Sequence, residues 1–341
     1  MAPTMTTTPA AEPPAAAAVA TIPNSMWRSS SPVIEEGALV ILFESHNAVT
    51  YCYTERGAVF YNRHGAFHHN DMIGQPFGSK LFSRDKKGVK GGYMLLLAPT
   101  PELWSRALRH RTQIVFTLDA SAIQFAAALR SGQRVVESGT GSGALTTSFA
   151  RTVAPHGHVF TFEYNPTRAQ IAREELARNG LQGVVTVDCR DAYEDGFPAE
   201  LAGSIDLVFL DLPCPWKVIG HATKALKQGG CFASYSPCIE QVQKTCDALR
   251  DAGYEMIKTI ETRLVPYSAR RVDLPTPDFG FDSAESTDAT ANDDSASDAA
   301  PSSKKRRLVN GKSVGDSLLA RKDQEIRGHT AFLTFASKFF A

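Results

Sequence analysis

The chain has 341 residues, 43% of them hydrophobic and 21% charged, which is enough for a full catalytic domain together with a smaller one. The formal net charge is zero, but residues 273–300 hold eight acids and no Lys or Arg, so the remainder carries 36 basic against 28 acidic residues. That remainder suits an anionic partner, although a mixed solvated surface would give the same count. No apolar run approaches the length of a membrane span, and the six cysteines show no metal-ligand spacing, so neither a membrane protein nor a metal site is expected.

The N-terminal part of the chain divides into two regions by composition. Residues 1–32 are rich in Ala, Pro and Thr and lack the basic start of a signal peptide, which predicts a disordered tail. Residues 33–100 alternate short apolar runs, clearest at 38–43 and 93–97, with glycine-containing turns, which indicates a small N-terminal β-domain. A helix is predicted to begin at Pro101, since proline is favoured at the first helical position.

Residues 134–150 have the pattern of a buried strand that turns tightly into a helix. Gly139, Gly141 and Gly143 can adopt positive φ and let the backbone approach a ligand, which the free N–H groups of the helix start would face. The spacing E-x-G-x-G-x-G from Glu137 differs from the dinucleotide fingerprint G-x-G-x-x-G, and it suits the carboxylate and adenosine of S-adenosylmethionine. A strained turn without a ligand is the alternative.

Two further predicted strands end in acids. The strand 158–163 closes with Glu163, twenty-four residues after Gly139, where an acid accepts hydrogen bonds from two ribose hydroxyls. The alternative is an acid that stands at a strand end by chance. The strand 184–187 leads to Asp191, which either accepts a hydrogen bond from an adenine amino group or only forms a turn.

The most specific pattern follows the apolar strand 204–211, whose composition predicts burial on both faces. This strand ends in D-L-P-C-P-W, residues 211–216, at the edge of the sheet where ligands bind in open α/β folds. Two prolines stiffen the loop and Trp216 closes it, so a flat ring could stack there while the Asp211 carboxylate meets its edge. A plain β-turn is the alternative.

The remaining elements complete an α/β sheet. A helix over 220–226, a turn at 228–230 and strands at 231–235 and 257–264 are expected. A helix is expected to begin within 236–240 and to run through Leu249. A closing strand is expected at 328–335, where it would pair with the strand at 257–264.

Between these last strands the composition changes. Residues 274–325 are acidic and poor in apolar side chains, which predicts a disordered insertion. Its basic cluster Lys304–Arg307 matches a nuclear-import signal, or it is an incidental cluster. The predicted organisation is therefore a methyltransferase-type domain over 101–273, interrupted by this insertion and completed by 326–341.

The order of elements is that of a Rossmann-like S-adenosylmethionine-dependent methyltransferase, and several motifs narrow the family. They are D-M-I-G-Q-P-F-G-S at 71–79, H-R-T-Q-I at 110–114, E-S-G-T-G-S-G at 137–143, D-L-P-C-P-W at 211–216 and S-P-C-I-E-Q-V at 236–242. Together these motifs closely resemble those of the catalytic subunits of eukaryotic tRNA (adenine-58-N1)-methyltransferases. The resemblance covers residues 33–274 and the closing strand. One departure, Cys214, falls in a variable position of its box.

This resemblance implies an activity and partners that the spacing alone does not give. The enzyme would transfer a methyl group from S-adenosylmethionine to N1 of adenosine 58 in the tRNA T-loop, with Asp211 as the catalytic residue at the N6/N1 edge of adenine. It would act in the nucleus with a homologous noncatalytic tRNA-binding subunit, as a heterotetramer with two copies of each.

The resemblance also implies site residues. The expected cofactor contacts are Val115, Gly139, Gly141, Ser142, Gly143, Ala144, Glu163, Arg168, Asp191, Ala192 and Asp211. The expected substrate contacts are Gln113, Ile114, Thr117, Ser236, Pro237, Cys238, Ile239, Tyr267, Arg270 and Thr330.

Other classes of function compete with this interpretation. A protein or small-molecule O-methyltransferase would share the glycine turn and Glu163 but would have no need of the D-L-P-C-P-W box. A dehydrogenase would share the first strand and turn, and titration with NADH would reveal it. A noncatalytic RNA-binding subunit would have no use for an intact glycine turn with Glu163 and Asp211.

Overall fold

A computed structural model describes residues 31–84, 91–275, 308–309, 312–322 and 328–339. The described residues form two compact units: one runs up to Thr262 and includes the segment from His329, and the other runs from Arg263 to Gly328. The basic cluster Lys304–Arg307 and residues 1–30 of the expected tail lie outside the described residues. None of the helices within the described ranges is long and apolar enough to cross a membrane.

The N-terminal region of the first unit is built of strands, as the apolar runs predict. A four-stranded antiparallel sheet has the order β2-β1-β6-β5, and β3 pairs with β4 in a separate hairpin. The bounds are β1 Leu39–Ser45, β2 Ala48–Tyr53, β3 Val59–Asn62, β4 Gly65–His68, β5 Lys80–Phe82 and β6 Tyr93–Leu97.

This sheet shares its core with the helices that follow it. Side chains alternate across β1, so that Leu39 and Ile41 pack in the core that contains Trp104, while Val40 and Leu42 pack in a second core inside the β-region. At the same junction the rings of Tyr51 and Trp104 lie 4.7 Å apart between centroids. The region 33–100 therefore belongs to the same compact unit as the α/β fold.

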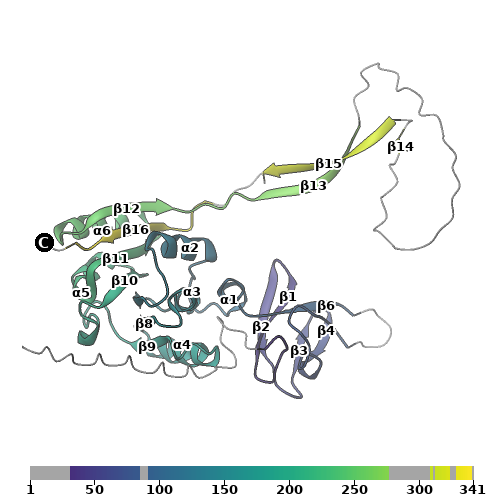
Figure 1. The fold of residues 1–341 in the computed structure, drawn as a ribbon, viewed down its shortest axis with the longest axis horizontal. Helices are drawn as coiled ribbons and strands as arrows, with labels where there is room; N and C mark the ends of the chain where they lie inside the picture. Colours follow the sequence, from purple (N-terminus) through teal and green to yellow (C-terminus); the bar gives the residue numbers. More distant parts are fainter. Residues whose placement is uncertain (1–30, 85–90, 276–307, 310–311, 323–327, 340–341) are drawn as a thin grey trace, which may run out of the picture. The chain divides into compact units, whose positions relative to one another are not determined.

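The centre of the first unit is a seven-stranded sheet of order β12-β16-β11-β10-β7-β8-β9 (Figure 1). The strands from β11 to β9 are parallel, and β16 runs antiparallel between β11 and β12. This topology confirms the predicted Rossmann-like fold and the pairing of the closing strand. The bounds are β7 Arg134–Ser138, β8 His158–Glu163, β9 Val185–Cys189, β10 Ile205–Leu210, β11 Leu226–Ser236, β12 Glu255–Glu261 and β16 Phe332–Ser337.

Helices cover both faces of this sheet because its central strands are apolar on both sides. Val135 and Phe209 face the core with α1 to α4, whereas Val136 and Leu210 face the core with α5 and α6. The helices are α1 Pro101–Ala107, α2 Thr117–Ala126, α3 Ala144–Val153, α4 Pro166–Arg178, α5 Ile219–Ala225 and α6 Ile239–Asp251.

One boundary differs from the expectation for a visible reason. A turn was expected at 228–230, but β11 begins at Leu226 and continues through it. Leu226 pairs with Ile205 ahead of a register shift, and Gly229 absorbs the irregularity at a φ of 74°. The glycines therefore mark a bulged strand rather than a turn.

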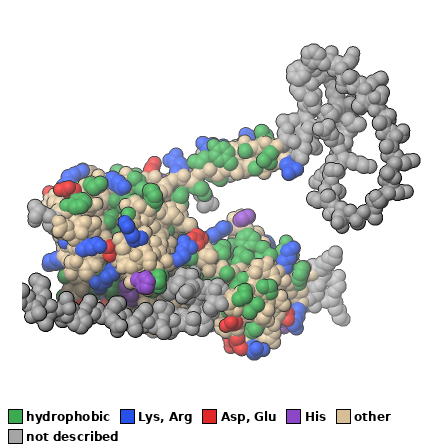
Figure 2. Space-filling model, viewed as in Figure 1, with side chains coloured by type: hydrophobic (Ala, Val, Ile, Leu, Met, Phe, Trp, Pro, Cys, Tyr) green, Lys and Arg blue, Asp and Glu red, His purple; other side chains and the backbone are tan. Residues whose placement is uncertain are grey.

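The second unit contains a long antiparallel hairpin of β13 Tyr267–Pro275 and β15 Lys312–Lys322, to which β14 Leu308–Val309 adds (Figure 1). This differs from the disorder expected over 274–325, since β15 lies inside that range. Exposed apolar side chains run along the hairpin (Figure 2), among them Tyr267 and Leu318. Backbone pairing between distant segments, which apolar content does not reveal, accounts for the difference.

Candidate active site

A cavity of about 500 Å³ opens where the strand order of the sheet reverses. The parallel strands β7 and β10 lie side by side there, and the N–H of Asp211 donates to the carbonyl of Ser138 at 2.9 Å. Ligands of open α/β sheets bind in the crevice at this switch point. A smaller cavity of about 30 Å³ shares Thr112, Gly139 and Asp211 with it.

The glycine turn brings the backbone against both of its neighbours. Gly139 has a φ of 98°, and a Cβ placed on it would overlap the backbone oxygen of Asp211. Gly141 has a φ of 53°, and a Cβ there would meet Thr112 Oγ1 at 2.5 Å. The third glycine, Gly143, is the N-cap of α3 at a φ of 75°. Glycine is required at position 139, where the neighbour is backbone, and it is favoured at position 141, where the neighbour is a side-chain hydroxyl.

Glu163 lines the larger cavity and is held in place by several hydrogen bonds. Its side chain is buried, and its Oε2 accepts the N–H of Gly141 at 3.0 Å. Its Oε1 accepts the guanidinium of Arg168 at 2.6 Å and the N–H of Asn165 at 3.1 Å. Asn165 also caps α4 by accepting the N–H of Arg168 at 3.0 Å. The carboxylate is therefore fixed between the glycine turn and the start of α4.

Asp191 forms the turn that the sequence allowed, and its position leaves the adenine contact as a prediction. It lines the cavity, and its Oδ1 also accepts the N–H of Tyr193 at 2.8 Å in a local turn. The hydroxyl of Tyr193 in turn accepts the N–H of Cys214 at 3.0 Å. A side chain from the loop after β9 thus reaches the D-L-P-C-P-W loop after β10.

Three carboxyl groups gather at the carboxyl ends of β7, β8 and β10. Burial raises the pKa of Asp211 to about 6. Burial also raises the pKa of Glu137 to about 7, although hydrogen bonds from Thr146 and Thr161 oppose the rise. The charges of Asp211 and Glu163 add to the rise at Glu137. The larger cavity is lined by the carboxyl groups of Glu163, Asp191 and Asp211 and by the guanidinium groups of Arg168 and Arg190. The excess of one carboxyl group favours a ligand that carries positive charge.

The segment 108–116 closes the site from the other side. Ser142 Oγ accepts the N–H groups of Arg111 at 2.9 Å and Thr112 at 3.2 Å, which ties this segment to the glycine turn. Gln113 lines the larger cavity, and Ile114 and Val115 line the smaller one with Ser142 and Ala144.

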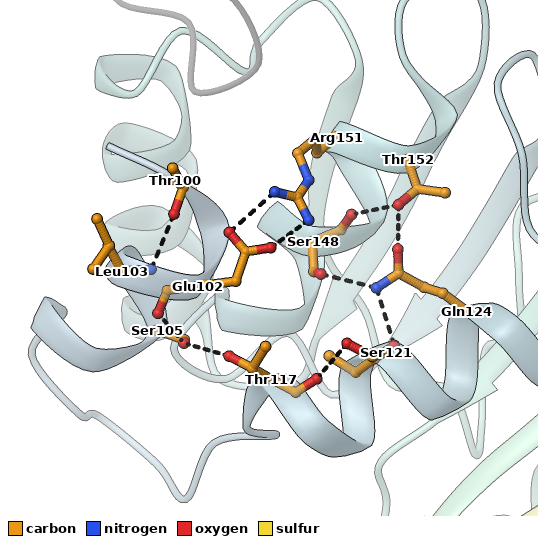
Figure 3. A network of polar contacts seen from close by, with 11 residues as sticks. Thr100, Glu102, Leu103, Ser105, Thr117, Ser121, Gln124, Ser148, Arg151 and Thr152 are labelled. Carbon is orange, nitrogen blue, oxygen red and sulfur yellow. Dashed lines mark hydrogen bonds and ion pairs between the residues drawn. The ribbon is translucent and has the colours of Figure 1, made fainter. Parts of the chain in front are cut away.

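A polar network fixes the helices at both ends of this segment (Figure 3). Glu102 of α1 accepts Arg151 of α3 at 3.0 Å, and Gln124 of α2 donates to Ser148 of α3 at 2.9 Å. Thr117, an expected substrate contact, has its hydroxyl 3.5 Å from Ser105 Oγ in this network and does not line the larger cavity.

The other expected residues are distributed unevenly. Gly139, Gly141, Glu163, Arg168, Asp191, Ala192 and Asp211 line the larger cavity, and Gly143 lines neither cavity. Of the expected substrate residues from Ser236 to Ile239, Ser236 ends β11 and Ile239 begins α6, and none of the four lines either cavity. Thr330 donates to the buried carboxylate of Asp119, while Tyr267 and Arg270 lie on β13 of the second unit.

Several cavity-lining residues were not predicted. Thr112, Tyr164, Arg190, Tyr193, Leu212 and Pro213 all line the larger cavity. Most of them stand next to a predicted residue: Tyr164 follows Glu163, Arg190 precedes Asp191, and Leu212 follows Asp211. Proximity to a strand-end acid was therefore the signal that could have found them.

The fold and the site define a Rossmann-like S-adenosylmethionine-dependent methyltransferase. The topology matches solved structures of this class: a SAM-dependent O-methyltransferase from Thermotoga maritima aligns with a TM-score of 0.68 and 25% identity, covering 91% of this chain and 96% of that one. The tRNA (m1A58) methyltransferase TrmI from Aquifex aeolicus has the same fold, with a TM-score of 0.62 and 19% identity over 91% of this chain and 100% of that one.

The chain belongs to the family described as tRNA methyltransferase complex GCD14 subunit, whose model matches residues 92–338. A relative from Dictyostelium discoideum, named tRNA (adenine(58)-N(1))-methyltransferase catalytic subunit, is 39% identical over 89% of this chain and 96% of its own length. A Candida albicans protein of the same description is 40% identical over 70% of each chain.

Proposed function

We propose that this chain is the catalytic subunit of a tRNA methyltransferase that transfers a methyl group from S-adenosylmethionine to N1 of adenosine 58. One observation carries the proposal. Glu163, Asp191 and Asp211 lie in one cavity at the switch point of the sheet. They do so in a chain that aligns over 89% of its length with a relative named for this activity.

The residues of the cavity fit S-adenosylmethionine. Its volume of about 500 Å³ lies in the range of small-molecule sites. The glycine turn lines the cavity, the buried Glu163 carboxylate can accept ribose hydroxyls, and the Asp191 carboxylate, which lines the same cavity, can accept a hydrogen bond from the adenine amino group. When bound, this cofactor supplies a methyl group on a positively charged sulfur, which suits the anionic site.

Asp211 is the residue that we assign to the target base. Its carboxylate can accept a hydrogen bond from the N6 amino group of adenine, which orients the neighbouring N1 and raises its electron density. The methylated ring carries a positive charge, and a partly buried carboxylate beside it stabilises that charge. The base must leave its stacked position in the T-loop to reach this site.

Replacing Glu163 with glutamine should weaken the binding of S-adenosylmethionine by about 10- to 100-fold, because a charged acceptor of ribose hydroxyls becomes a neutral amide. The NH2 group of the glutamine would also replace one of the two carboxylate oxygens, so that a donor would face either the N–H of Gly141 or the guanidinium of Arg168. Isothermal titration gives the dissociation constant. Glu174→Gln, an exposed change on α4, is the control, and equal affinities in the two variants would contradict the role of Glu163.

We also propose that the chain works with a homologous noncatalytic tRNA-binding subunit, in a heterotetramer of two copies of each, in the nucleus. The family description, which names a subunit of a complex, supports a partner. The exposed apolar side chains of the β13–β15 hairpin, among them Tyr267 and Leu318, support one as well, since exposed apolar surface is typical of protein interaction sites. The nuclear location rests on the sequence Lys304–Arg307.

Methyl transfer from labelled S-adenosylmethionine to unmodified tRNA tests the activity. We expect N1-methyladenosine when the chain is combined with its partner subunit and none with the chain alone, because tRNA binding is shared. A tRNA with guanosine at position 58 is the control and should stay unlabelled. Failure to form methylated adenosine in either case, with cofactor binding intact, would favour a protein or small-molecule O-methyltransferase.

A further inference from the structure

The peptide group between Pro213 and Cys214 is held at both of its polar atoms by side chains. The N–H of Cys214 donates to the hydroxyl of Tyr193 at 3.0 Å, and the carbonyl of Pro213 accepts Nε2 of Gln241 at 2.8 Å. Pro213 and Pro215 have no N–H group, so Cys214 supplies the only backbone donor of this proline-flanked stretch. The carbonyl and N–H of a trans peptide point in opposite directions, so a rotation of the group breaks at least one bond.

The two side chains come from different parts of the site. Tyr193 lines the cavity and is itself held by Asp191, two residues earlier, so it approaches the loop from the cofactor side. Burial raises the pKa of its hydroxyl, so this group remains protonated and neutral at physiological pH. Its ring position is therefore coupled to the wall of the cofactor cavity.

Gln241 approaches from the first turn of α6. Its Oε1 accepts the N–H of Cys238, the N-cap of this helix, at 3.2 Å, while its Nε2 donates to Pro213. One amide thus caps the helix and holds the loop at the same time. Glutamate could make the first contact but not the second, and lysine could make the second but not the first.

The chain on either side of this peptide is already fixed. Before it, Asp211 donates its N–H to Ser138 in the neighbouring strand at 2.9 Å. After it, the N–H of Lys217 donates to the carbonyl of Cys214 at 3.1 Å, and Lys244 of α6 lies 5.1 Å from the ring centre of Trp216. The Pro213–Cys214 peptide is the middle of the short span between these anchors.

We propose that Tyr193 and Gln241 act together as positioning residues, which hold the Pro213–Cys214 peptide and thereby set the carboxylate of Asp211 relative to the target base. This inference rests on the proposed function. Neither side chain is assigned to the reacting atoms. Their contribution is to keep the acid of the D-L-P-C-P-W loop in the geometry that methyl transfer requires, where small displacements have large effects on rate.

The test compares Tyr193→Phe, Gln241→Glu and Gln241→Lys in the assembled complex with tRNA. Tyr193→Phe and Gln241→Glu should each lower kcat by about tenfold, while the KM for S-adenosylmethionine and the melting temperature stay close to the wild-type values. Gln241→Lys, which retains a donor for Pro213, should recover most of kcat. In the double variant Tyr193→Phe/Gln241→Glu, the fold-reduction of kcat should be smaller than the product of the two single fold-reductions, because either change already frees the same peptide.

Matched controls are available for both changes. Tyr254→Phe removes a hydroxyl that lies 3.0 Å from Thr223, and Gln243→Glu adds the same charge on the exposed side of α6. The inference is overturned if kcat stays within twofold of wild type, if the single effects multiply, or if the loss appears only in melting temperature. The proposed function is tested separately, by whether the wild-type complex forms N1-methyladenosine, and this result does not depend on the kcat values of the variants.

Discussion

Replacing Asp211 with asparagine should lower kcat for methyl transfer by at least about 100-fold while the affinity for S-adenosylmethionine changes by less than about fivefold. The substitution preserves the size of the side chain but removes the charge that would stabilise the methylated, cationic base. Single-turnover transfer to tRNA measures the first quantity and isothermal titration the second. Asp247→Asn, an exposed change on α6, is the control, and near-wild-type turnover by Asp211→Asn would refute the assignment.

The substitution Asp211→Asn should also change how the stability of the protein depends on pH. Burial raises the pKa of Asp211 from 3.8 to about 6, so the folded protein binds this proton more tightly than the unfolded chain does. The contribution of this proton to the free energy of unfolding is fully present below pH 3.8, and it is lost as the pH rises through about 6. At pH 8 the Asn variant should therefore be more stable than wild type by up to about 3 kcal/mol.

Activity should follow the opposite trend. In the proposed mechanism the ionised carboxylate of Asp211 accepts a hydrogen bond from the N6 amino group, so kcat should fall as the pH drops below about 6. Glu137, whose pKa burial raises to about 7, affects stability with the same sign as Asp211. Melting curves of wild type and variant must therefore be compared at each pH. A variant less stable than wild type at pH 8 would contradict the electrostatic account.

Replacing Gly139 with alanine should abolish methyl transfer and destabilise the fold by about 2–5 kcal/mol. About 1–2 kcal/mol follows from the φ of 98°, which alanine adopts only with strain. A further 1–3 kcal/mol, approximately, follows from the overlap of the new Cβ with the backbone oxygen of Asp211, which has no flexible end that can move away. Relief of that overlap must displace β10 from β7 and distort the cavity.

Gly132 provides a matched control for this prediction. It has a φ of 87°, and a Cβ added to it meets no atom within 4 Å. Gly132→Ala should therefore show the strain alone, with a loss of about 1–2 kcal/mol and full methyl transfer. Thermal denaturation and the transfer assay compare the two variants. Equal stabilities would show that the close approach of Gly139 to Asp211 is unimportant.

Local sequence pattern was sufficient to predict the succession of strands along the chain and the glycine turn. The apolar runs around Gly139 and Asp211 and the acids at strand ends obey rules that act within a few residues of sequence, so their place in a parallel sheet could be anticipated. The cavity of the structure indeed joins Glu163, Asp191 and Asp211.

Long-range contacts could not be predicted in this way. Tyr193 reaches Cys214 across 21 residues and Gln241 reaches Pro213 across 28, and nothing in the flanking sequence specifies either bond. Thr330 binds Asp119 across 211 residues, a contact that only the insertion of β16 next to α2 creates. The hairpin strand β15 escaped notice because its stability comes from pairing with β13, not from its own apolar content.

The position of β16 bears on how the protein is made. This strand lies between β11 and β12, although some seventy residues separate it from β12 in the chain. A ribosome therefore releases the strands that form the cavity well before it releases the one that closes the sheet. Until then β11 exposes an unpaired edge, and β12 lacks its neighbour in the sheet, which is β16. A nascent chain that stalls within this interval would contain every residue of the cavity and still be prone to aggregate, so that translation speed through residues 263–331 should affect the yield of active enzyme.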